Sequence, residues 1–325
     1  MLTLGYKLSS EEFGPNDLVR YGRMAEEHGF EFALISDHFH PWTDAQGQSP
    51  FVWSVIGGLA HATKRLVIGT GVTCPTMRLH PVVVAQAAAT SAAMLEGRFF
   101  LGVGSGENLN EHVAGARWPA VDVRQEMLEE AVAVIRQLWQ GGYQDHHGRY
   151  YTVENARLYT LPSEPPALLV AAAGPEAAKL AGRIGDGLVC TSAERELVQA
   201  FNGTGGKGKP RYAELTVCWA ESERSARRTA HRQWPTAAME WPLSTDLALP
   251  AHFQTVAKMV TEDAVAEEIP CGPDADAHLE AIREYEKAGF DHLCIHQVGP
   301  DQAGFMRFYA EEILPRFERR RKKAA

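Results

Sequence analysis

Eight short apolar segments recur along the chain, and longer stretches with helical periodicity separate them. Short β-branched or apolar runs are typical of buried parallel strands, and consecutive parallel strands need a crossover connection, usually a helix. The sequence therefore predicts an α/β fold with a parallel sheet. The predicted strands are residues 3–7, 32–36, 66–72, 99–103, 168–172, 187–191, 214–219 and 292–297.

Two helix-to-strand junctions favour closure of this sheet into one barrel. Gly29-Phe30 and Gly289-Phe290 follow the first and last predicted helices, and glycine can adopt the left-handed conformation that ends a helix. No G-x-G-x-x-G pattern of an open dinucleotide-binding sheet follows the first strand. We therefore predict a single (β/α)8 (TIM) barrel over residues 1–325. The clearest helical segments are 17–28, 50–63, 81–94, 124–140 and 277–288.

Two longer segments interrupt the alternation, one after the fourth strand and one after the seventh. Residues 143–159 have the alternating pattern of a hairpin or extended loop, and residues 235–260 form an insertion rich in Pro, Ala and Trp. Loops that follow strands lie on the catalytic face of such a barrel, so residues 235–260 are predicted to form a lid. Residues 302–325 should form a C-terminal helix and a basic tail, whose charge at 319–323 suits a helix C-terminus.

Charge and cysteine content argue against several classes of protein. The 41 acidic and 32 basic residues give a formal charge of -9, which does not attract nucleic acid or anionic lipid. Five cysteines without a Cys-x-x-Cys pair indicate neither a disulfide framework nor a zinc ribbon. With no signal-peptide pattern and no membrane-spanning apolar run, we expect a soluble cytoplasmic protein without nucleic-acid or membrane partners.

The second predicted strand ends in SDHFHPW at residues 36–42, a cluster of polar and aromatic side chains. Residues at the C-terminal strand ends of a barrel point into its active site. Histidine is the natural acid or base near neutral pH, and a neighbouring carboxylate such as Asp37 can fix its tautomer. We predict a catalytic role for His38. The alternative for His38 and His40 is to cap or solvate the loop.

The fourth strand ends in GSGENLN at residues 104–110. These glycines can let the backbone approach a flat or phosphorylated ligand, although glycine also occurs at tight barrel turns. Glu107 follows directly, and a partly buried carboxylate can have a pKa raised into the range useful for proton transfer.

Small residues also end the third and fifth strands. After the fifth strand, Ala173-Gly174 precedes Pro175 at the first turn of a predicted helix. This arrangement leaves a helix N-terminus open to an anion, such as the phosphate of a cofactor tail. A compact strand-to-helix turn explains the same residues equally well.

Four motifs in order carry a resemblance to a known family. They are SDHFHPW at 36–42, GVTCP at 71–75, GSGENLNE at 104–111 and AAGP at 172–175. With them the chain resembles the F420-dependent glucose-6-phosphate dehydrogenase group of the luciferase-like superfamily. It is also similar to F420-dependent secondary alcohol dehydrogenases. The resemblance covers nearly the whole chain and implies a homodimeric barrel that binds coenzyme F420 and transfers hydride between a hydroxyl-bearing carbon and deazaflavin C5.

The resemblance also implies roles for particular residues. His38 and Glu107 would be the acid/base pair, in exchangeable roles, with Trp42 and Glu11 beside the reacting centre. His38 would take the substrate hydroxyl proton while Glu107 protonates or stabilises the ring. A non-prolyl cis peptide is implied at Gly71-Val72. The implied cofactor contacts are Asp37, Gly71, Val72, Cys74, Ser105, Gly106, Asn110, Ala173, Gly174, Glu176 and Ala177.

The substrate side departs from the sugar-phosphate enzymes of this group. Those enzymes hold the substrate phosphate with basic residues, and where the first is expected, after the sixth strand, this chain has Glu194; Thr255 stands near another. A phosphate dianion beside uncompensated carboxylates is disfavoured, so we predict a neutral alcohol or other hydroxyl or carbonyl compound instead of glucose-6-phosphate. The predicted substrate pocket contains Thr191, Glu194, Trp219 and His296, with packing at the barrel rim as the alternative for the last two.

Three other functions remain open from the residues alone. An FMN-dependent luciferase-like monooxygenase or oxidoreductase would use the same barrel and a similar ring. The His38-x-His40 spacing also suits a metal-dependent hydrolase, because side chains at i and i+2 of a strand share a face. A non-catalytic ligand-binding barrel is the third, although His38 and Glu107 together argue against it.

Overall fold

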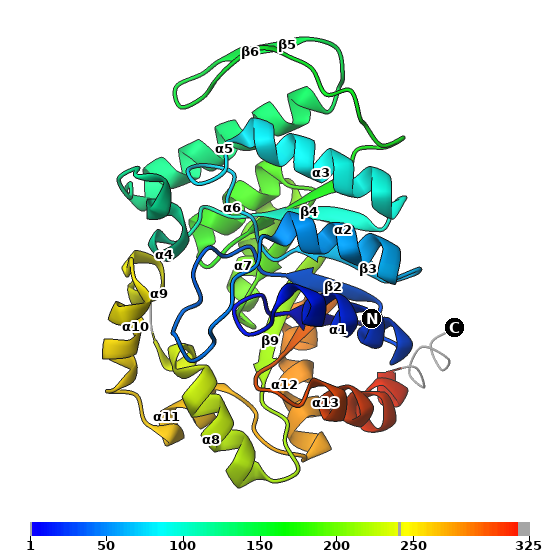
Figure 1. The fold of residues 1–325 in the computed structure, drawn as a ribbon, viewed down its shortest axis with the longest axis vertical. Helices are drawn as coiled ribbons and strands as arrows, with labels where there is room; N and C mark the ends of the chain where they lie inside the picture. The colour runs from blue at the N-terminus through cyan, green and yellow to red at the C-terminus, as the bar shows by residue number, and fades with distance from the viewer. Residues whose placement is uncertain (1, 240–241, 318–325) are drawn as a thin grey trace.

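Eight parallel strands close into a barrel in the computed structural model, which describes residues 2–239 and 242–317 (Figure 1). Their order around the barrel is β1-β10-β9-β8-β7-β4-β3-β2. Each observed strand overlaps a predicted one, so the prediction of a closed (β/α)8 barrel is confirmed. The strands are β1 Thr3–Leu8, β2 Phe32–Ile35, β3 Val67–Thr70, β4 Phe99–Val103, β7 Ala167–Ala171, β8 Gly187–Cys190, β9 Arg211–Val217 and β10 His292–Gln297.

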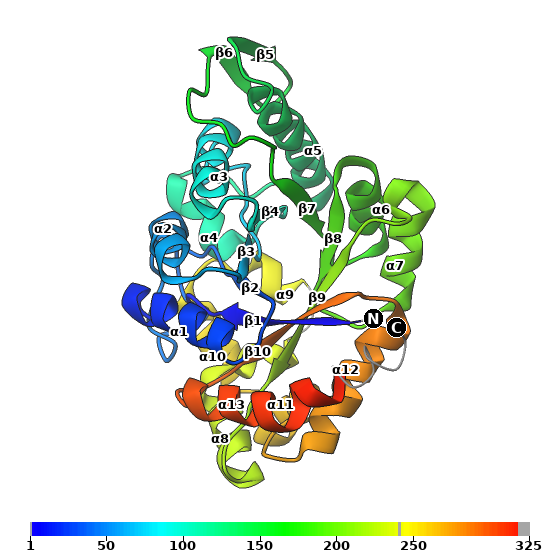
Figure 2. The same cartoon turned by 90° about the vertical axis from the view of Figure 1, so that its right-hand side faces the viewer.

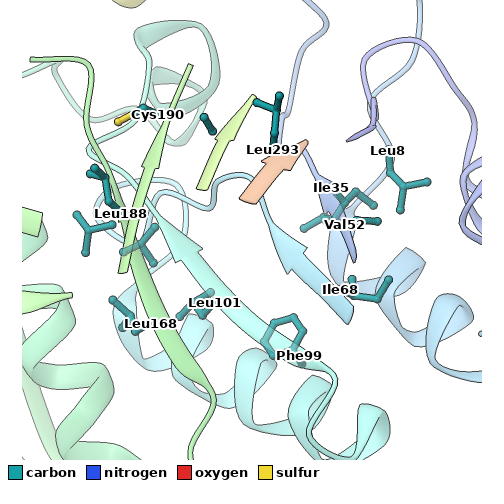
Figure 3. Packing of buried hydrophobic residues seen from close by; sticks show 14 of the residues in the cluster. Leu8, Ile35, Val52, Ile68, Phe99, Leu101, Leu168, Leu188, Cys190 and Leu293 are labelled. Atoms are coloured by element: carbon teal, nitrogen blue, oxygen red, sulfur yellow. The ribbon is translucent and has the colours of Figure 1, made fainter. Parts of the chain in front are cut away.

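Helices surround the barrel, and the main apolar core lies between them and the strands (Figure 2). Figure 3 shows members of this layer on neighbouring strands, among them Ile35, Ile68 and Leu101, which are fully buried. The five predicted helices are present, with ends displaced by at most three residues. The surrounding helices are α1 Pro15–Glu27, α2 Val52–Ala62, α3 Pro81–Leu95, α5 Val121–Leu138, α6 Pro175–Ile184, α7 Arg195–Phe201, α12 Ala275–Ala288 and α13 Gln302–Phe308.

A second, smaller apolar cluster fills the inside of the barrel. Alternate residues of a strand face inward, and two of these positions are glycines that leave room for phenyl rings. A Cβ added to Gly5 would lie 2.5 Å from the ring of Phe32, and one added to Gly69 would lie 2.1 Å from the ring of Phe100. The inward positions above this layer carry the polar side chains of Lys7, Glu214 and His296.

We expect the Gly69→Ala substitution to lower the free energy of unfolding by about 1–3 kcal/mol, because the added methyl overfills the barrel interior. Chemical denaturation measures this change. Gly203→Ala is the matched control, since a Cβ there meets no atom within 4 Å. Equal stabilities for the two variants would contradict the packing of Gly69 against Phe100.

The structure contains both the predicted hairpin and the predicted insertion, and the two lie in different parts of the fold. Strands β5 (Gln144–His147) and β6 (Thr152–Ala156) form an antiparallel hairpin that contacts α5. Figure 1 shows α9 (Leu243–Asp246) beside α4 (Asn108–Glu111), which follows β4 at the C-terminal end of the barrel. The insertion and its flanks form α8 Glu223–Gln233, η3 Pro235–Ala238, α9 Leu243–Asp246, α10 Pro250–Ala257 and α11 Glu262–Glu268.

The expected C-terminal helix begins at Gln302 as α13 and continues into a π-helical turn, Tyr309–Ile313. The basic tail predicted at 319–323 lies outside the described residues. Within residues 2–239 and 242–317, no helix combines the length and apolar character needed to cross a membrane.

Candidate active site

Three titratable side chains meet at the C-terminal end of the barrel, each from a different loop. His38 follows β2, Glu11 follows β1, and Glu107 precedes α4 after β4. His38 Nε2 lies 3.3 Å from Glu11 Oε1 and 3.5 Å from Glu107 Oε2. The structure therefore brings together the predicted acid/base pair and the predicted third carboxylate.

The backbone fixes the orientation of the His38 ring. Its Nδ1 lies 3.1 Å from the carbonyl oxygen of His40, which can only accept a hydrogen bond. Nδ1 therefore carries a proton, and Nε2 is the ring nitrogen that can gain or lose a proton beside the two carboxyl groups. This tautomer suits a proton acceptor at Nε2.

Glu11 is held in its ionised form. Its carboxyl accepts hydrogen bonds from the Ser36 hydroxyl at 2.6 Å and the Ser9 hydroxyl at 3.1 Å, and the residue is 3% exposed. Burial alone would raise the pKa of Glu11, but His38, Lys7 and these contacts lower it to about 2. A carboxylate fixed in this way stabilises positive charge on His38.

The pKa of Glu107, in contrast to that of Glu11, is raised. Burial of its carboxyl among protein groups raises the pKa of Glu107, nearby Glu11 raises it further, and His38 offsets part of the effect. Its side chain is nevertheless 31% exposed toward the open end of the barrel, and its Oε2 accepts a hydrogen bond from Asn110 Nδ2 at 3.0 Å. Neighbouring carboxyl groups with pKa values pushed apart are a typical acid/base arrangement.

The predicted insertion contacts the site through aromatic rings. The Trp42 ring packs edge-on against His38, with centroids 5.2 Å apart, and against Phe253 of α10 at 5.1 Å. Gln46 Nε2 also donates to the carbonyl of Gln233 at 3.0 Å. The sequence did not identify Phe253; its only signal is an apolar position in a helical stretch that begins at Pro250.

The peptide bond between Gly71 and Val72 is cis, as the resemblance implied. Glycines of the β4 strand end lie close against Val72: a Cβ added to Gly104 would lie 2.8 Å from Val72 Cγ2. Ser105 and Gly106 continue this wall and are partly exposed, and Gly106 has a positive φ of 80°. The wall provides the close backbone approach that a flat ring requires.

Three of the residues predicted to contact the cofactor have side chains that are buried within the wall. Asp37 accepts from the Thr73 hydroxyl at 2.8 Å and pairs with Arg78 at 2.8 Å. The Asn110 side-chain oxygen accepts from two backbone amides of the loop after β2, and Cys74 is 5% exposed. The Asp37 and Asn110 side chains therefore hold neighbouring loops together.

The other predicted cofactor contacts lie at the start of α6. Gly174 is the residue before the helix, without a side-chain cap, and Pro175 occupies the first turn. Ala173 and Glu176 are exposed, Ala177 is partly exposed, and Glu176 pairs with Lys179 at 2.6 Å. The first backbone amides of α6 are therefore not occupied by a side-chain cap.

The four residues predicted to form the substrate pocket do not come together. Thr191 and Glu194 are exposed after β8, where Glu194 accepts from the Ser192 hydroxyl at 2.9 Å. Trp219 stacks on Phe308 at 5.9 Å and lines a separate cavity of about 320 Å³ beside α8. His296 is fully buried beneath Trp234, with ring centroids 4.4 Å apart. The surroundings of Trp219 and His296 favour the alternative given for them, packing at the barrel rim.

The histidine pair of the metal hypothesis does not form a metal site. His40 stacks on His112 and places its Nδ1 3.0 Å from the carbonyl of Leu109. In the part of the chain that the structure describes, no three His, Cys, Asp or Glu side chains are arranged to hold a metal ion. The donor set gives a metal-dependent hydrolase no support.

Known proteins match this chain over nearly its full length. The model of the luciferase-like monooxygenase family matches residues 3–292. The chain is 37% identical to an F420-dependent glucose-6-phosphate dehydrogenase of Beutenbergia cavernae, over 100% of both chains, and 38% identical to that of Microbacterium testaceum, over 98% of both. A solved F420-dependent secondary alcohol dehydrogenase, in complex with an F420-acetone adduct, aligns with a TM-score of 0.88 and 31% identity, covering 96% of this chain and 98% of that one.

Proposed function

The chain belongs to the luciferase-like monooxygenase family, and we propose that it is a coenzyme F420-dependent dehydrogenase that acts on a neutral hydroxyl or carbonyl compound. One arrangement supports this function above all: His38 Nε2 faces both Glu11 and Glu107. Relatives that align with this chain over nearly their full length are named as F420-dependent enzymes. When bound, coenzyme F420 supplies a deazaflavin carbon, C5, that accepts or donates hydride.

The residues of the site fit such a cofactor. Gly104 and Gly106 let the β4 strand end pack tightly against Val72 and Cys74, and the wall that results would offer a flat ring a surface made largely of backbone. The uncapped start of α6 offers amide donors to a phosphorylated tail. Ser105 and Gly174 would hold the group through hydroxyl and backbone contacts.

In the proposed reaction, His38 and Glu107 carry out two different proton transfers. His38 accepts the substrate hydroxyl proton at Nε2, because its Nδ1 is already a donor to the His40 carbonyl. The Glu11 carboxylate stabilises the imidazolium that results. Glu107 holds a proton on Oε1, since its Oε2 accepts from Asn110. Trp42 and Phe253 exclude water from the ring of His38.

We expect glucose-6-phosphate to be a poor substrate, with a kcat/KM at least about a hundredfold below that of the best neutral alcohol. Exposed Glu194 lies where the family resemblance implies a cation, and its carboxylate would repel a phosphate dianion. Glu194→Lys should raise kcat/KM for the sugar phosphate at least about tenfold without changing that for the alcohol. Glu196→Lys, in the first turn of the helix that begins after Glu194, is the control. Efficient turnover of glucose-6-phosphate by the unmodified protein would contradict the prediction.

Cofactor binding tests the function directly. Purified protein titrated into F420 should quench the fluorescence of the cofactor in a saturable way, whereas an unrelated barrel should not. A panel of alcohols and sugar phosphates, followed by loss of absorbance of the oxidised cofactor, then identifies the substrate class. Tight binding of FMN with none of F420 would favour a flavin-dependent monooxygenase instead.

A further inference from the structure

The ring of Trp42 packs against both His38 and the insertion. It meets the ring of His38 edge-on, with centroids 5.2 Å apart and planes inclined at 62°, and that of Phe253 in α10, with centroids 5.1 Å apart and planes at 78°. Phe253 is fully buried, whereas Trp42 is partly exposed. Phe253 therefore offers no surface of its own to a ligand, and any effect that it has on one must pass through Trp42.

The backbone of Trp42 is held separately from its ring. The Trp42 amide donates to Gln46 Oε1 at 2.8 Å, and Gln46 Nε2 donates at 3.0 Å to the carbonyl of Gln233, the last residue of α8. These two hydrogen bonds hold the loop in place without any contribution from Phe253. What Phe253 adds is contact with the indole itself, and this contact restricts the rotation of the Trp42 side chain.

A substrate that gives its hydroxyl proton to His38 must come close to this indole. The hydroxyl oxygen has to lie about 2.6–3.2 Å from Nε2, and the carbon that bears it is one bond further away. Because the rings of His38 and Trp42 are in contact, the substituents of that carbon compete with the indole for space on this side of His38. The position of the indole therefore limits the size of the substituent that fits there.

We propose that Phe253 is a specificity-determining residue: it holds the Trp42 ring against His38, so the site selects alcohols with small substituents and excludes bulky ones. This inference rests on the proposed function, because it concerns the substrate of the same site. Phe253 is a positioning residue in this role, since it touches Trp42 and not the substrate. A smaller side chain at position 253 gives the indole room to move away from His38, and the space that opens admits a larger substituent.

The position of the indole can be followed in the protein without cofactor. Fluorine NMR of protein labelled with 5-fluorotryptophan gives a resonance for Trp42, which Trp42→Phe assigns. We expect Phe253→Ala to shift or broaden this resonance, because the ring loses the neighbour that restricts it. Phe201→Ala is the matched control: Phe201 is also fully buried, but it lies at the end of α7 and packs against Gly206. It should leave the Trp42 resonance unchanged.

The same variants test substrate selection with F420 and two alcohols, 2-propanol as the small one and 1-phenylethanol as the bulky one. The unmodified protein should prefer 2-propanol, and Phe253→Ala should raise the ratio of kcat/KM for 1-phenylethanol to that for 2-propanol at least about tenfold. Phe201→Ala should leave this ratio unchanged. If Phe253→Ala does not fold, Phe253→Leu carries both measurements.

The outcomes separate this inference from the function on which it rests. The inference is overturned by a folded variant of Phe253 with an unchanged ratio or an unchanged Trp42 resonance, and equally by an unmodified protein that turns over alcohols without preferring 2-propanol. Failure of the unmodified protein to bind F420, or to oxidise any alcohol, would instead overturn the proposed function.

Discussion

Replacement of His38 by alanine is expected to lower kcat by a factor of about 10²–10⁴, the usual contribution of a positioned acid or base. The loss should fall on chemistry, because Nε2 is the atom that faces both carboxyl groups and Nδ1 is used by the backbone. The dissociation constant for F420 should change only a few-fold, since the cofactor wall is built from other strand ends. Steady-state rates and fluorescence titration measure the two quantities separately.

His40→Ala is the matched control for this variant. His40 lies two residues away and has the same chemistry, but its ring stacks on His112 and its Nδ1 bonds to the Leu109 carbonyl. We expect less than about a tenfold loss of kcat. If His38→Ala lost cofactor affinity and kcat equally, His38 would be a binding residue and the proposed proton transfer would be wrong.

The fold could be predicted from the sequence because the alternation of strands and helices is strong. Every barrel strand is a short apolar run, and its neighbours in the barrel are fixed once the sheet closes. The same focus on apolar runs gave no prediction for the polar side chains inside the barrel, where Lys7 pairs with Glu214. Lys7 and Glu214 each interrupt an apolar strand, and their inward direction depends on the register of alternation, which Gly5 and Tyr212 establish only in the folded barrel.

The sequence located residues at strand ends but did not predict the direction of every side chain. The rule that strand ends carry function locates a residue along the barrel axis, but not the direction of its side chain. Trp219 follows the end of β9 and turns outward to Phe308, whereas His296 points inward and is covered by Trp234. The position of Trp234, at the end of α8 directly before the insertion, depends on tertiary contacts and cannot be read from local pattern.

The resemblance gave positions of cofactor contact without the atoms involved. For Gly71 and Val72 the implied feature was a cis peptide bond, which is a property of the backbone and is present in the structure. For Asp37 and Asn110 the structure adds the side-chain atoms, which bond to neighbouring loops. Such residues support the shape of the wall, and their substitution should disturb the loops before it disturbs any ligand contact.

Substitution of Glu107 by glutamine is expected to lower kcat by about 10²–10³ and to remove one limb of its pH profile. Burial and the nearby Glu11 carboxylate raise the pKa of Glu107, so its acid form persists to higher pH than that of an ordinary glutamate. As pH rises through this pKa, Glu107 ionises and two carboxylates face His38, so wild-type kcat should fall on the alkaline side. Glutamine does not titrate, and the alkaline limb should disappear.

The pH dependence of kcat, measured with saturating alcohol and F420, decides between the two possible roles of this residue. Loss of the alkaline limb assigns Glu107 as the proton donor and leaves His38 as the acceptor. Loss of the acid limb instead would make Glu107 the base, and the assignment to His38 would be reversed. Asn108→Ala is a suitable control, because its side chain donates to the Asp246 carbonyl of the insertion and not to the carboxyl cluster. Its profile should keep both limbs, because the charges around His38 Nε2 are unchanged in that variant.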